Sequence, residues 1–334
     1  MTNKETYSIG VIGSGSWATA LVKILSENVK ELNWWLRDPE QIASINEHGR
    51  NPKYLTSAVL KPDNLVMEPD LNVVIERSQI LIMVVPSTYI YSVFRDVNPE
   101  QLADKVLFSS VKGMVSEFDM VPAKFFHKKF DMPYKSLGII CGPCHAEEVA
   151  MERLSYLTVA SKSKSKAKYL AELLECRYIK TLVSDDVIGS EIATAMKNVF
   201  AIASGICHGL GYGDNFQAVL VSNAIREMEI FLDAVKPIHR DVKCSAYLGD
   251  LLVTAYSNFS RNRNFGSMIG KGYTVKTAML EMNMVAEGYY AVKSLVAMNE
   301  KYNLDLDITK AVYRILYEKN APKMEMYILA DKLS

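Results

Sequence analysis

The chain has 334 residues, enough for about two domains of ~100–200 residues each, and 49% of them are apolar. Its 38 Lys and Arg balance 38 Asp and Glu, so the formal net charge is zero. This balance argues against nucleic acid as a partner, because such binding draws on an excess of positive charge. The composition is that of a globular protein and not of a disordered one.

The N-terminus, the apolar runs and the cysteines indicate the cellular compartment of the protein. Residues 1–8 carry charges of both signs and lead into a short apolar run, unlike a secretory signal. The longest apolar run, Ile80–Pro86, is far shorter than the ~20 residues needed to cross a bilayer. The cysteines are an odd number in a long chain, which predicts reduced thiols. We expect a cytoplasmic protein without a membrane span.

The first half alternates short apolar runs with amphipathic stretches, a pattern typical of a parallel sheet flanked by helices. A first helix is expected at Ala18–Leu25. The expected strands are Tyr7–Ile12, Leu32–Leu36, Ile80–Val85, Val106–Ser109, Leu137–Cys141, Leu157–Val159 and Tyr178–Leu182. The pattern predicts an α/β domain over residues 1–186, Rossmann-like, with a doubly wound and mostly parallel sheet.

The second half shows helical patterns and almost no strand signal. From Val187 to Leu210, apolar residues recur every three to four positions, which predicts a long helix with one buried stripe. Further helices are expected at Phe216–Val235, Leu251–Tyr256, Thr274–Ala297 and Ile308–Tyr317. This predicts an all-helical C-terminal domain over residues 187–334.

A glycine-rich turn stands between the first strand and the first helix. Gly13 and Gly15 permit a tight turn and let backbone N–H groups approach a pyrophosphate at the helix N-terminus. Arg37 and Asp38 follow the second strand about 20 residues later. An acid there favours NAD, because it binds a ribose hydroxyl, whereas an arginine favours the 2′-phosphate of NADP. The sequence therefore predicts a dinucleotide cofactor, NAD or NADP.

Two cysteines share the spacing of a thioredoxin-type redox site, in the run Cys141-Gly142-Pro143-Cys144. Here the run follows a late strand of a dinucleotide-binding domain and not the first βαβ unit of a small fold. We interpret it as a coincidental pair of reduced thiols, with a redox pair as the alternative.

Lys197 lies on a second face of the long helix. Small or polar residues share its narrow arc at about 100° per residue: Ser190, Ala193, Ala201, Ser204 and His208. Such neighbours leave room for another molecule to approach the lysine. On spacing alone, a solvated surface lysine is an equal alternative.

A third group combines Gly249-Asp250-Leu251 with Ser260-Arg261-Asn262-Arg263. We expect Asp250 to be buried at a helix start and the Ser260–Arg263 segment to form a loop. The loop offers hydroxyl, amide and guanidinium donors, which suit a phosphate group. No metal site is expected.

Taken in chain order, these segments resemble the bacterial-type NAD(P)-dependent glycerol-3-phosphate dehydrogenases over nearly the whole chain. The resemblance rests on Gly-Ser-Gly-Ser-Trp-Ala-Thr-Ala (13–20), Val-Pro-Ser (85–87), Val-Lys-Gly (111–113), Cys-Gly-Pro (141–143), Met-Lys-Asn-Val (196–199), Gly-Asp-Leu (249–251), Ser-Arg-Asn-Arg (260–263) and Val-Ala-Glu-Gly (285–288). It implies reversible hydride transfer between NAD(P)H and dihydroxyacetone phosphate, giving sn-glycerol 3-phosphate for phospholipid synthesis. The implied partner is a small phosphorylated substrate, and a homodimer stays open.

The resemblance also implies roles for individual residues. Lys197 would be the general acid/base, with Asp250 as the second catalytic residue. The implied substrate-binding residues are Lys112, Gly142, Cys144, Lys197, Asp250, Ser260, Arg261 and Asn262. The implied cofactor-binding residues are Gly13, Gly15, Ser16, Trp17, Arg37, Lys112, Ala146, Arg261, Val285 and Glu287.

The base role needs a lowered pKa, because a free lysine is protonated at neutral pH. Desolvation in a cleft, together with Lys112 and Arg261, would lower the pKa of Lys197, and Asp250 would oppose that shift. The chain departs from the family pattern at four positions, where Ser or Thr, Phe, Lys and Gly are usual: Cys144, His145, Gln217 and Leu248.

Two alternatives remain beside this interpretation. One is another two-domain dehydrogenase, acting on a hydroxy acid or a nucleotide sugar. The other is a regulatory protein that binds the cofactor but has lost turnover. The presence of Lys197 and Asp250 argues against the second alternative.

Overall fold

The computed structural model describes residues 7–282 and 285–334, and the chain divides into two compact units. The first unit extends to Val85 and also takes in Tyr89–Val111 and Pro122–Val187. The second unit consists of Ile188 onward together with two short segments, Pro86–Thr88 and Lys112–Val121. These two segments come from the first half of the sequence and group with the helices. Domains with bounds 1–186 and 187–334 stay a prediction.

The first unit contains an eight-stranded sheet with the strand order β3-β2-β1-β4-β5-β6-β7-β8. Every neighbouring pair is parallel except β6 and β7, which confirms a mostly parallel, doubly wound sheet. The strands are β1 (Ile9–Ile12), β2 (Leu32–Trp35), β3 (Leu65–Glu68), β4 (Ile80–Met83), β5 (Val106–Ser109), β6 (Leu137–Cys141), β7 (Ser155–Ser161) and β8 (Ile179–Ser184). Strand β3 was not predicted from the sequence. It is a four-residue edge strand that is mostly half-exposed and so lacks a continuous apolar run.

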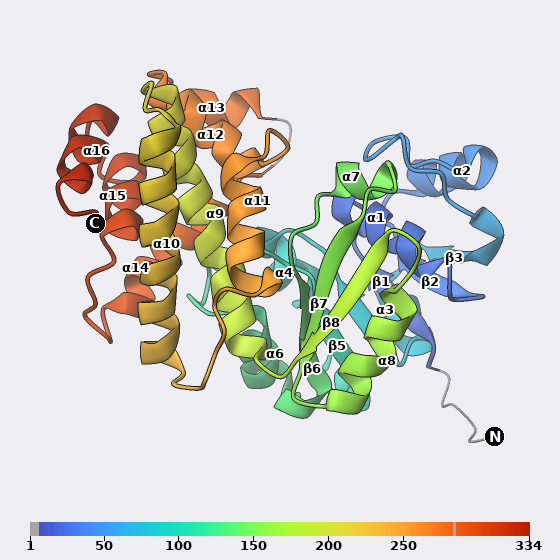
Figure 1. The fold of residues 1–334 in the computed structure, drawn as a ribbon. Coiled ribbons are helices and arrows are strands. Elements are labelled where there is room, and N and C mark those ends of the chain that lie inside the picture. The colour runs from blue at the N-terminus through green and yellow to red at the C-terminus, as the bar shows by residue number, and fades with distance from the viewer. Residues whose placement is uncertain (1–6, 283–284) are drawn as a thin grey trace. The chain divides into compact units, whose positions relative to one another are not determined.

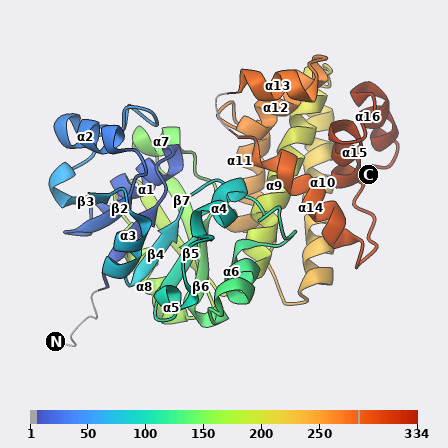
Figure 2. The same ribbon diagram turned by 180° about the vertical axis from the view of Figure 1, so that it is seen from behind.

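Helices cover both faces of this sheet (Figures 1 and 2). They are α1 (Ser16–Leu25), α2 (Pro39–His48), α3 (Leu71–Arg77), α4 (Ile90–Phe94), α5 (Pro99–Leu102), α6 (Pro122–Phe130), α7 (Ala146–Ala150) and α8 (Lys164–Leu174). Helices α1, α7 and α8 pack together, as do α3, α5 and α6. The strands beneath them are buried on both faces, as their apolar runs predict.

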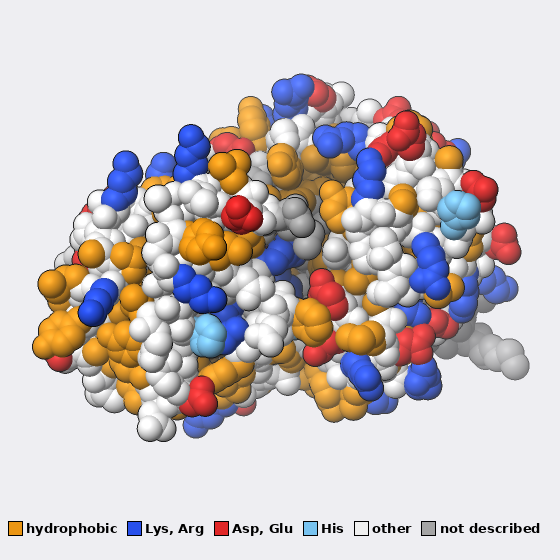
Figure 3. Space-filling model, turned by 90° about the horizontal axis from the view of Figure 1, so that it is seen from above, with side chains coloured by type: hydrophobic (Ala, Val, Ile, Leu, Met, Phe, Trp, Pro, Cys, Tyr) orange, Lys and Arg blue, Asp and Glu red, His pale blue; other side chains and the backbone are white. Residues whose placement is uncertain are grey.

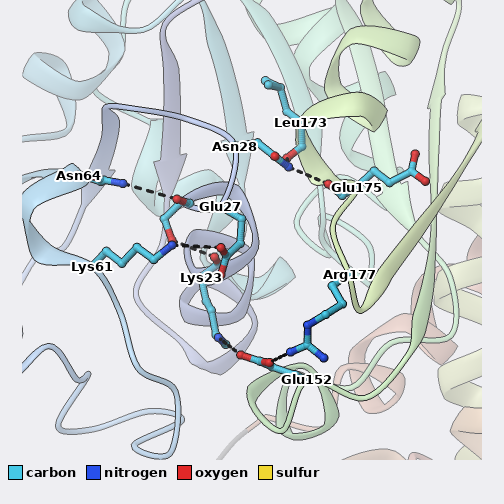
Figure 4. A network of polar contacts seen from close by, with 10 residues as sticks. Lys23, Glu27, Asn28, Lys61, Asn64, Glu152, Leu173, Glu175 and Arg177 are labelled. Carbon is cyan, nitrogen blue, oxygen red and sulfur yellow. Dashed lines mark hydrogen bonds and ion pairs between the residues drawn. The ribbon is translucent and has the colours of Figure 1, made fainter.

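A polar network anchors the last turns of α1 (Figure 4). Lys23 donates to Glu152 at 2.9 Å, and Arg177 pairs with the other oxygen of the same carboxylate. Asn28 donates to the carbonyl oxygens of Leu173 and Glu175, at the end of α8. These bonds tie the C-terminal end of α1 to the region around α7 and α8, so its N-terminal end has a fixed direction.

The second unit is helical. Its elements are α9 (Val187–Gly209), α10 (Asp214–Val235), a π-helical turn η4 (Ser245–Gly249), α11 (Asp250–Tyr256), α12 (Arg261–Gly270), α13 (Val275–Glu281), α14 (Glu287–Asn299), α15 (Asp307–Leu316) and α16 (Pro322–Ala330). Within residues 7–282 and 285–334, no helix has the length and apolar character to cross a membrane.

Two expectations about these helices are wrong, and one helix was missed. The Ser260–Arg263 segment is not a loop, because the Ser260 hydroxyl accepts from the N–H of Arg263 and starts α12. The single helix expected at Thr274–Ala297 is two helices, with extended backbone at Met282 and Ala286. Helix α16 was not expected at all.

Helix α9 is buried on every side up to Cys207, which corrects the expected single stripe. All residues from 186 to 207 are buried, including polar ones such as Ser190, Thr194 and Asn198. A helix enclosed by its neighbours has no solvated face. The arc of small residues around Lys197 is therefore a packing surface.

Glycines allow α9 and α12 to pack backbone against backbone. A Cβ atom at Gly205 of α9 would lie 2.0 Å from the carbonyl oxygen of Arg263, and one at Gly266 of α12 would lie 2.1 Å from that of Ile202. Gly209 and Gly270, four residues further along each helix, are equally crowded. Such contacts permit no side chain, so the four glycines fix how closely the two helices approach.

We expect Gly266→Ala to destabilise the protein by about 3 kcal/mol, because the added methyl group would overlap the backbone of α9. This cost exceeds the helix-propensity gain of about 1 kcal/mol from replacing glycine. Gly213→Ala is the matched control, since no atom lies within 4 Å of its added Cβ and its φ of −82° suits any residue. Urea unfolding would measure both variants, and equal midpoints for the two would contradict the packing argument.

Candidate active site

The glycine-rich turn after β1 fits a dinucleotide pyrophosphate. Gly13 has a φ of +130°, and a Cβ there would lie 2.7 Å from the carbonyl oxygen of Val84, so the position requires glycine. No atom lies within 4 Å of a Cβ built on Gly15, which is the N-cap of α1 and has no side-chain cap. The first N–H groups of α1, beginning at Ser16, can therefore bind an anion.

Side chains hold the carbonyl oxygens of this turn. Trp34 Nε1 donates to the Gly13 oxygen at 2.7 Å, and Thr19 Oγ1 donates to the Gly15 oxygen at 3.0 Å. Asn51 Nδ2 donates to the Ser14 oxygen at 3.1 Å. With the carbonyl groups fixed in this way, the peptide planes of the turn have a defined orientation for binding.

Asn51 is the centre of this support and was not predicted from the sequence. It is fully buried, and its Oδ1 accepts from Gln41 Nε2 at 2.8 Å and from the backbone N–H groups of Lys53 and Tyr54. Its Nδ2 also donates to Thr19 Oγ1 at 2.8 Å. One amide thus links the turn to α1, α2 and the segment after α2.

We expect Asn51→Ala to raise the Kd for NAD(P)H about tenfold, since losing these bonds releases the turn by roughly 1.4 kcal/mol. Isothermal titration with each nucleotide would measure the change. Asn33→Ala is the control, because Asn33 is also buried in the first unit but donates to the Ile9 carbonyl, away from the turn. An unchanged Kd in Asn51→Ala would remove Asn51 from this role.

Trp17 and Arg37 lie at the carboxyl ends of strands. Trp17 Nε1 donates to Ser110 Oγ at 2.7 Å, and Ser110 Oγ donates to the Ile140 carbonyl at 3.2 Å, which ties α1 to the ends of β5 and β6. Arg37 is exposed just after β2. Asp38 beside it caps α2 by accepting from the N–H of Glu40 at 3.0 Å.

Three predicted site residues follow β6. Gly142 has a φ of +122°, and a Cβ there would lie 2.7 Å from the Tyr156 carbonyl oxygen. Cys144 is 3% exposed and packs in the hydrophobic core of the first unit, and Ala146 begins α7. Because Cys141 is also only 1% exposed, neither thiol has the accessibility that a redox pair requires, and the structure supports the coincidental interpretation.

Lys197 is 2% exposed in the second unit, so the surface-lysine alternative is wrong. Its amine donates to Asp250 Oδ1. Burial lowers the pKa of Lys197 to about 7, the Asp250 carboxylate opposes that shift, and the positive charge of Lys112 adds to it. Such an amine can take up or release a proton near neutral pH.

Asp250 has one oxygen on Lys197 and one without a partner. The residue is 1% exposed at the start of α11, directly after the π-helical turn η4. Its Oδ2 is buried and has no hydrogen-bond partner among the described residues. A buried carboxylate oxygen without a partner is costly, so a hydroxyl group arriving here would gain a strong hydrogen bond.

Lys112 is held against α9 through its backbone. Asn198, which follows Lys197 on α9, donates from Nδ2 to the Lys112 carbonyl oxygen. Asn198 belongs to one of the sequence motifs, but no role was predicted for it. Its bond explains how a segment from the first half of the chain comes to influence the pKa of Lys197.

The start of α12 carries the other predicted phosphate-binding residues. Asn262 is buried, and its Oδ1 accepts from the N–H of Gly288 at 2.9 Å, so it supports the start of α14. Arg261 is exposed, with one long contact of 3.5 Å to the Val285 carbonyl. Ser260 caps the helix and is itself buried. Arg261 is therefore the residue of this group with most of its donors available.

Glu287, the first residue of α14, pairs with Ser87, a motif residue for which no role was predicted. Its Oε1 accepts from the Ser87 N–H at 3.0 Å, and its Oε2 from the Ser87 hydroxyl. Burial raises the pKa of Glu287, against the effect of these bonds. The contact joins two motifs, Val-Pro-Ser and Val-Ala-Glu-Gly, that lie far apart in the sequence. Their spacing therefore gives no sign that they meet.

The structure explains some of the departures from the family pattern. Gln217 is buried and exchanges two hydrogen bonds of 2.9 Å with Ser204, one through each end of its amide, which joins α10 to α9. His145 is the N-cap of α7, and Leu248 lies in the π-helical turn before Asp250. Nothing in the structure explains why histidine stands at position 145.

The two units together define a class of protein. A doubly wound sheet whose first turn can bind a pyrophosphate is a dinucleotide-binding fold. A buried lysine with a pKa near neutrality, beside a carboxylate, has the chemistry needed to exchange a proton with a hydroxyl or carbonyl group. The chain is a nicotinamide-dependent oxidoreductase of the kind that acts on an alcohol or a carbonyl group.

Comparison with known proteins gives the family. The models for the N-terminus and the C-terminus of NAD-dependent glycerol-3-phosphate dehydrogenase match residues 8–167 and 186–327. A glycerol-3-phosphate dehydrogenase [NAD(P)+] of Desulfotalea psychrophila is 35% identical over 98% of both chains, and one of Staphylococcus aureus is 32% identical over 94% of this chain and 95% of its own. The chain belongs to the NAD-dependent glycerol-3-phosphate dehydrogenase family.

Solved structures agree with this assignment. The crystal structure of glycerol-3-phosphate dehydrogenase from Coxiella burnetii superimposes with a TM-score of 0.90 at 28% identity, covering 97% of this chain and 99% of that one. That of Saccharomyces cerevisiae has a TM-score of 0.79 at 26% identity, with 97% and 99% coverage.

Proposed function

We propose that this protein interconverts dihydroxyacetone phosphate and sn-glycerol 3-phosphate with NAD(P)H, and that Lys197 is its general acid/base. The observation that carries the proposal is the buried Lys197 amine on Asp250, with a pKa of about 7. A group with this pKa is present in both protonation states at neutral pH, which a reversible reaction requires.

The reaction transfers one hydride and one proton. In oxidation, the neutral Lys197 amine takes the proton of the C2 hydroxyl while the C2–H bond breaks. A bound nicotinamide would provide the hydride chemistry, as acceptor in oxidation and as donor in reduction. In reduction, the Lys197 ammonium group returns the proton to the carbonyl oxygen as that oxygen gains charge. Asp250 orients the amine through Oδ1 and can accept a substrate hydroxyl through Oδ2.

The substrate phosphate needs positive charge from the same unit. Arg261 at the start of α12 offers an exposed guanidinium group, and the positive end of the helix dipole adds to its field. Lys112, held next to α9 by Asn198, supplies a second cation. We assign Arg261 and Lys112 to the phosphate, with Ser260 and Asn262 fixing the geometry of the α12 start.

Lys197→Met tests the proposal directly, by assay of NADH and NADPH oxidation with dihydroxyacetone phosphate. We expect wild-type turnover and a loss of about 10³-fold in kcat in the variant, because the proton donor is gone. Cofactor binding should be retained. Lys23→Met is the control, as Lys23 is another buried lysine whose partner Glu152 keeps Arg177. Full activity of Lys197→Met would refute the assignment.

The pH dependence should have opposite signs in the two directions. Because the neutral amine is the base, kcat/KM for oxidation should rise with pH and level off above about 7. Reduction needs the ammonium form, so its kcat/KM should fall as pH rises through the same value. Removing a carboxylate favours the neutral amine, so Asp250→Asn should move both profiles to lower pH. Lys112→Met should move them to higher pH.

Profiles that shift in the same direction in both variants would contradict this account. A non-phosphorylated hydroxy acid assayed in parallel tests the alternative dehydrogenase. We expect it to be a poor substrate, since Arg261 would then have no phosphate to bind. Turnover of dihydroxyacetone phosphate would exclude the alternative of a regulatory protein that binds the cofactor without catalysis. A supply of glycerol 3-phosphate to phospholipid synthesis, a cytoplasmic location and a homodimer stay predictions.

A further inference from the structure

One edge of the first unit concentrates positive charge. Residues 122–136 and 162–168 contain eight lysines, no arginine and a single acid, Asp131. Because the whole chain is neutral, the rest of the molecule balances this excess of seven positive charges. We call the surface that these lysines form the basic edge: Lys124, Lys128, Lys129, Lys135, Lys162, Lys164, Lys166 and Lys168.

The two segments lie side by side in the fold. Strands β6 and β7 pair, and Ser161 Oγ at the end of β7 donates to the Leu137 carbonyl oxygen at the start of β6, at 3.1 Å. This places the start of α8 beside the short 3-10 turn η3 (Tyr134–Ser136). The end of α6 reaches the same turn, since the ring centroids of His127 and Tyr134 lie 4.2 Å apart. Figure 1 shows α6, β6 and α8 in the lower part of the view.

Few carboxylates neutralise these lysines. Lys162 pairs with Asp185 at 3.4 Å, and Glu100 lies on α5, which packs against α6. Six lysines make no ion pair with any residue in 7–282 or 285–334: Lys128, Lys129, Lys135, Lys164, Lys166 and Lys168. All six are exposed except Lys166, which is half-buried. Partial burial lowers the pKa of Lys166, and the positive charge of Lys135 adds to that effect.

The lysines of α8 lie at the unfavourable end of their helix. A helix N-terminus is the positive end of the helix dipole and favours acids. The first turn of α8 contains Lys164 and Lys166 but no acid, and the side chain of its N-cap residue Ser163 makes no capping bond. Lys128 and Lys129 differ, because the last turn of α6 favours cations. Helix stability therefore does not explain the lysines of α8, whereas an anionic partner would.

The chemistry of the basic edge fits a fluid anionic surface. Lysine is a flexible point charge that attracts phosphate without a fixed geometry, whereas arginine suits partners of defined shape such as nucleic acid. The lysines come from three separate elements, α6, η3 and α8, so they form a broad surface. Among them, Tyr134 is 38% exposed and offers an aromatic ring with a polar tip, a side chain typical of the headgroup region of membranes.

We propose that the basic edge binds to the surface of membranes that contain anionic phospholipids. Strand β6 starts at this edge, whereas the glycine turn follows the carboxyl end of β1. Strands β1, β4, β5 and β6 run parallel, so the basic edge and the glycine turn lie at opposite edges of the sheet. Attachment at one edge does not cover the other. This surface goes beyond the proposed function and does not depend on it.

Co-sedimentation with lipid vesicles tests the surface. Vesicles of phosphatidylcholine alone are compared with vesicles that also contain phosphatidylglycerol, which is anionic. We expect binding to the mixed vesicles only, and its loss at high salt, because salt screens the charges. A lysine near such a surface contributes about fivefold to the partition coefficient, so combining Lys135→Gln, Lys164→Gln and Lys166→Gln should weaken binding about 100-fold.

The matched control combines Lys301→Gln, Lys319→Gln and Lys323→Gln, three exposed lysines of the second unit, and changes the net charge equally. It should bind the mixed vesicles as wild type does. The test variant should melt no earlier than wild type, because it removes cations from the positive end of α8. Vesicle binding is measured without substrate or cofactor, so its result is independent of whether the enzyme turns over.

Three results would overturn the proposal. The first is equal binding to the two kinds of vesicle. The second is equal weakening in the two triple variants, which would show that only the net charge matters. The third is tighter binding to single-stranded RNA than to the mixed vesicles at equal phosphate concentration, which would make nucleic acid the partner.

Discussion

The second unit depends on the direct contact between the backbones of α9 and α12. Gly205 and Gly266 each face a carbonyl oxygen of the other helix at a distance that excludes a side chain. Gly288 brings α14 against α9 in the same manner, 2.6 Å from the Asn198 carbonyl for an added Cβ. Helix α9 is enclosed, and Lys197 on it is 2% exposed. Burial is the main cause of the lowered pKa of that amine.

Opposing charges then bring the lysine to a pKa near neutrality. Burial favours the neutral amine, whereas the Asp250 carboxylate favours the ammonium group. Lys112 opposes the effect of Asp250 on the pKa of Lys197. Asn198, which lies on the same helix as Lys197, holds the Lys112 backbone in place. Neighbouring residues of α9 therefore supply both the amine with the lowered pKa and the hydrogen bond that positions Lys112, one of the groups that lower it.

Features with a local pattern could be predicted from the sequence, and features made by distant contacts could not. Apolar runs predicted seven of the eight strands, and the glycines after the first strand predicted the tight turn before α1. Asn51 supports that turn from 37 positions further along the chain, and Ser87 meets Glu287 across 200 positions, so neither leaves a periodic signal. The paired glycines of α9 and α12, each spaced by four residues, were visible and would have indicated close helix packing.

The zero net charge has a structural counterpart in the pairing of surface charges. Figure 3 shows Lys and Arg side chains interspersed with Asp and Glu over one face of the molecule. Around β2 and β3, Lys53 pairs with Asp38 and Arg77 with Glu68, whereas Arg37 has no such partner in the described chain. Paired charges cancel within a few ångströms, and salt screens what remains beyond a Debye length of about 8–10 Å. An anionic ligand is therefore attracted mainly where a cation lacks a partner, which makes Arg37 more informative than the overall charge.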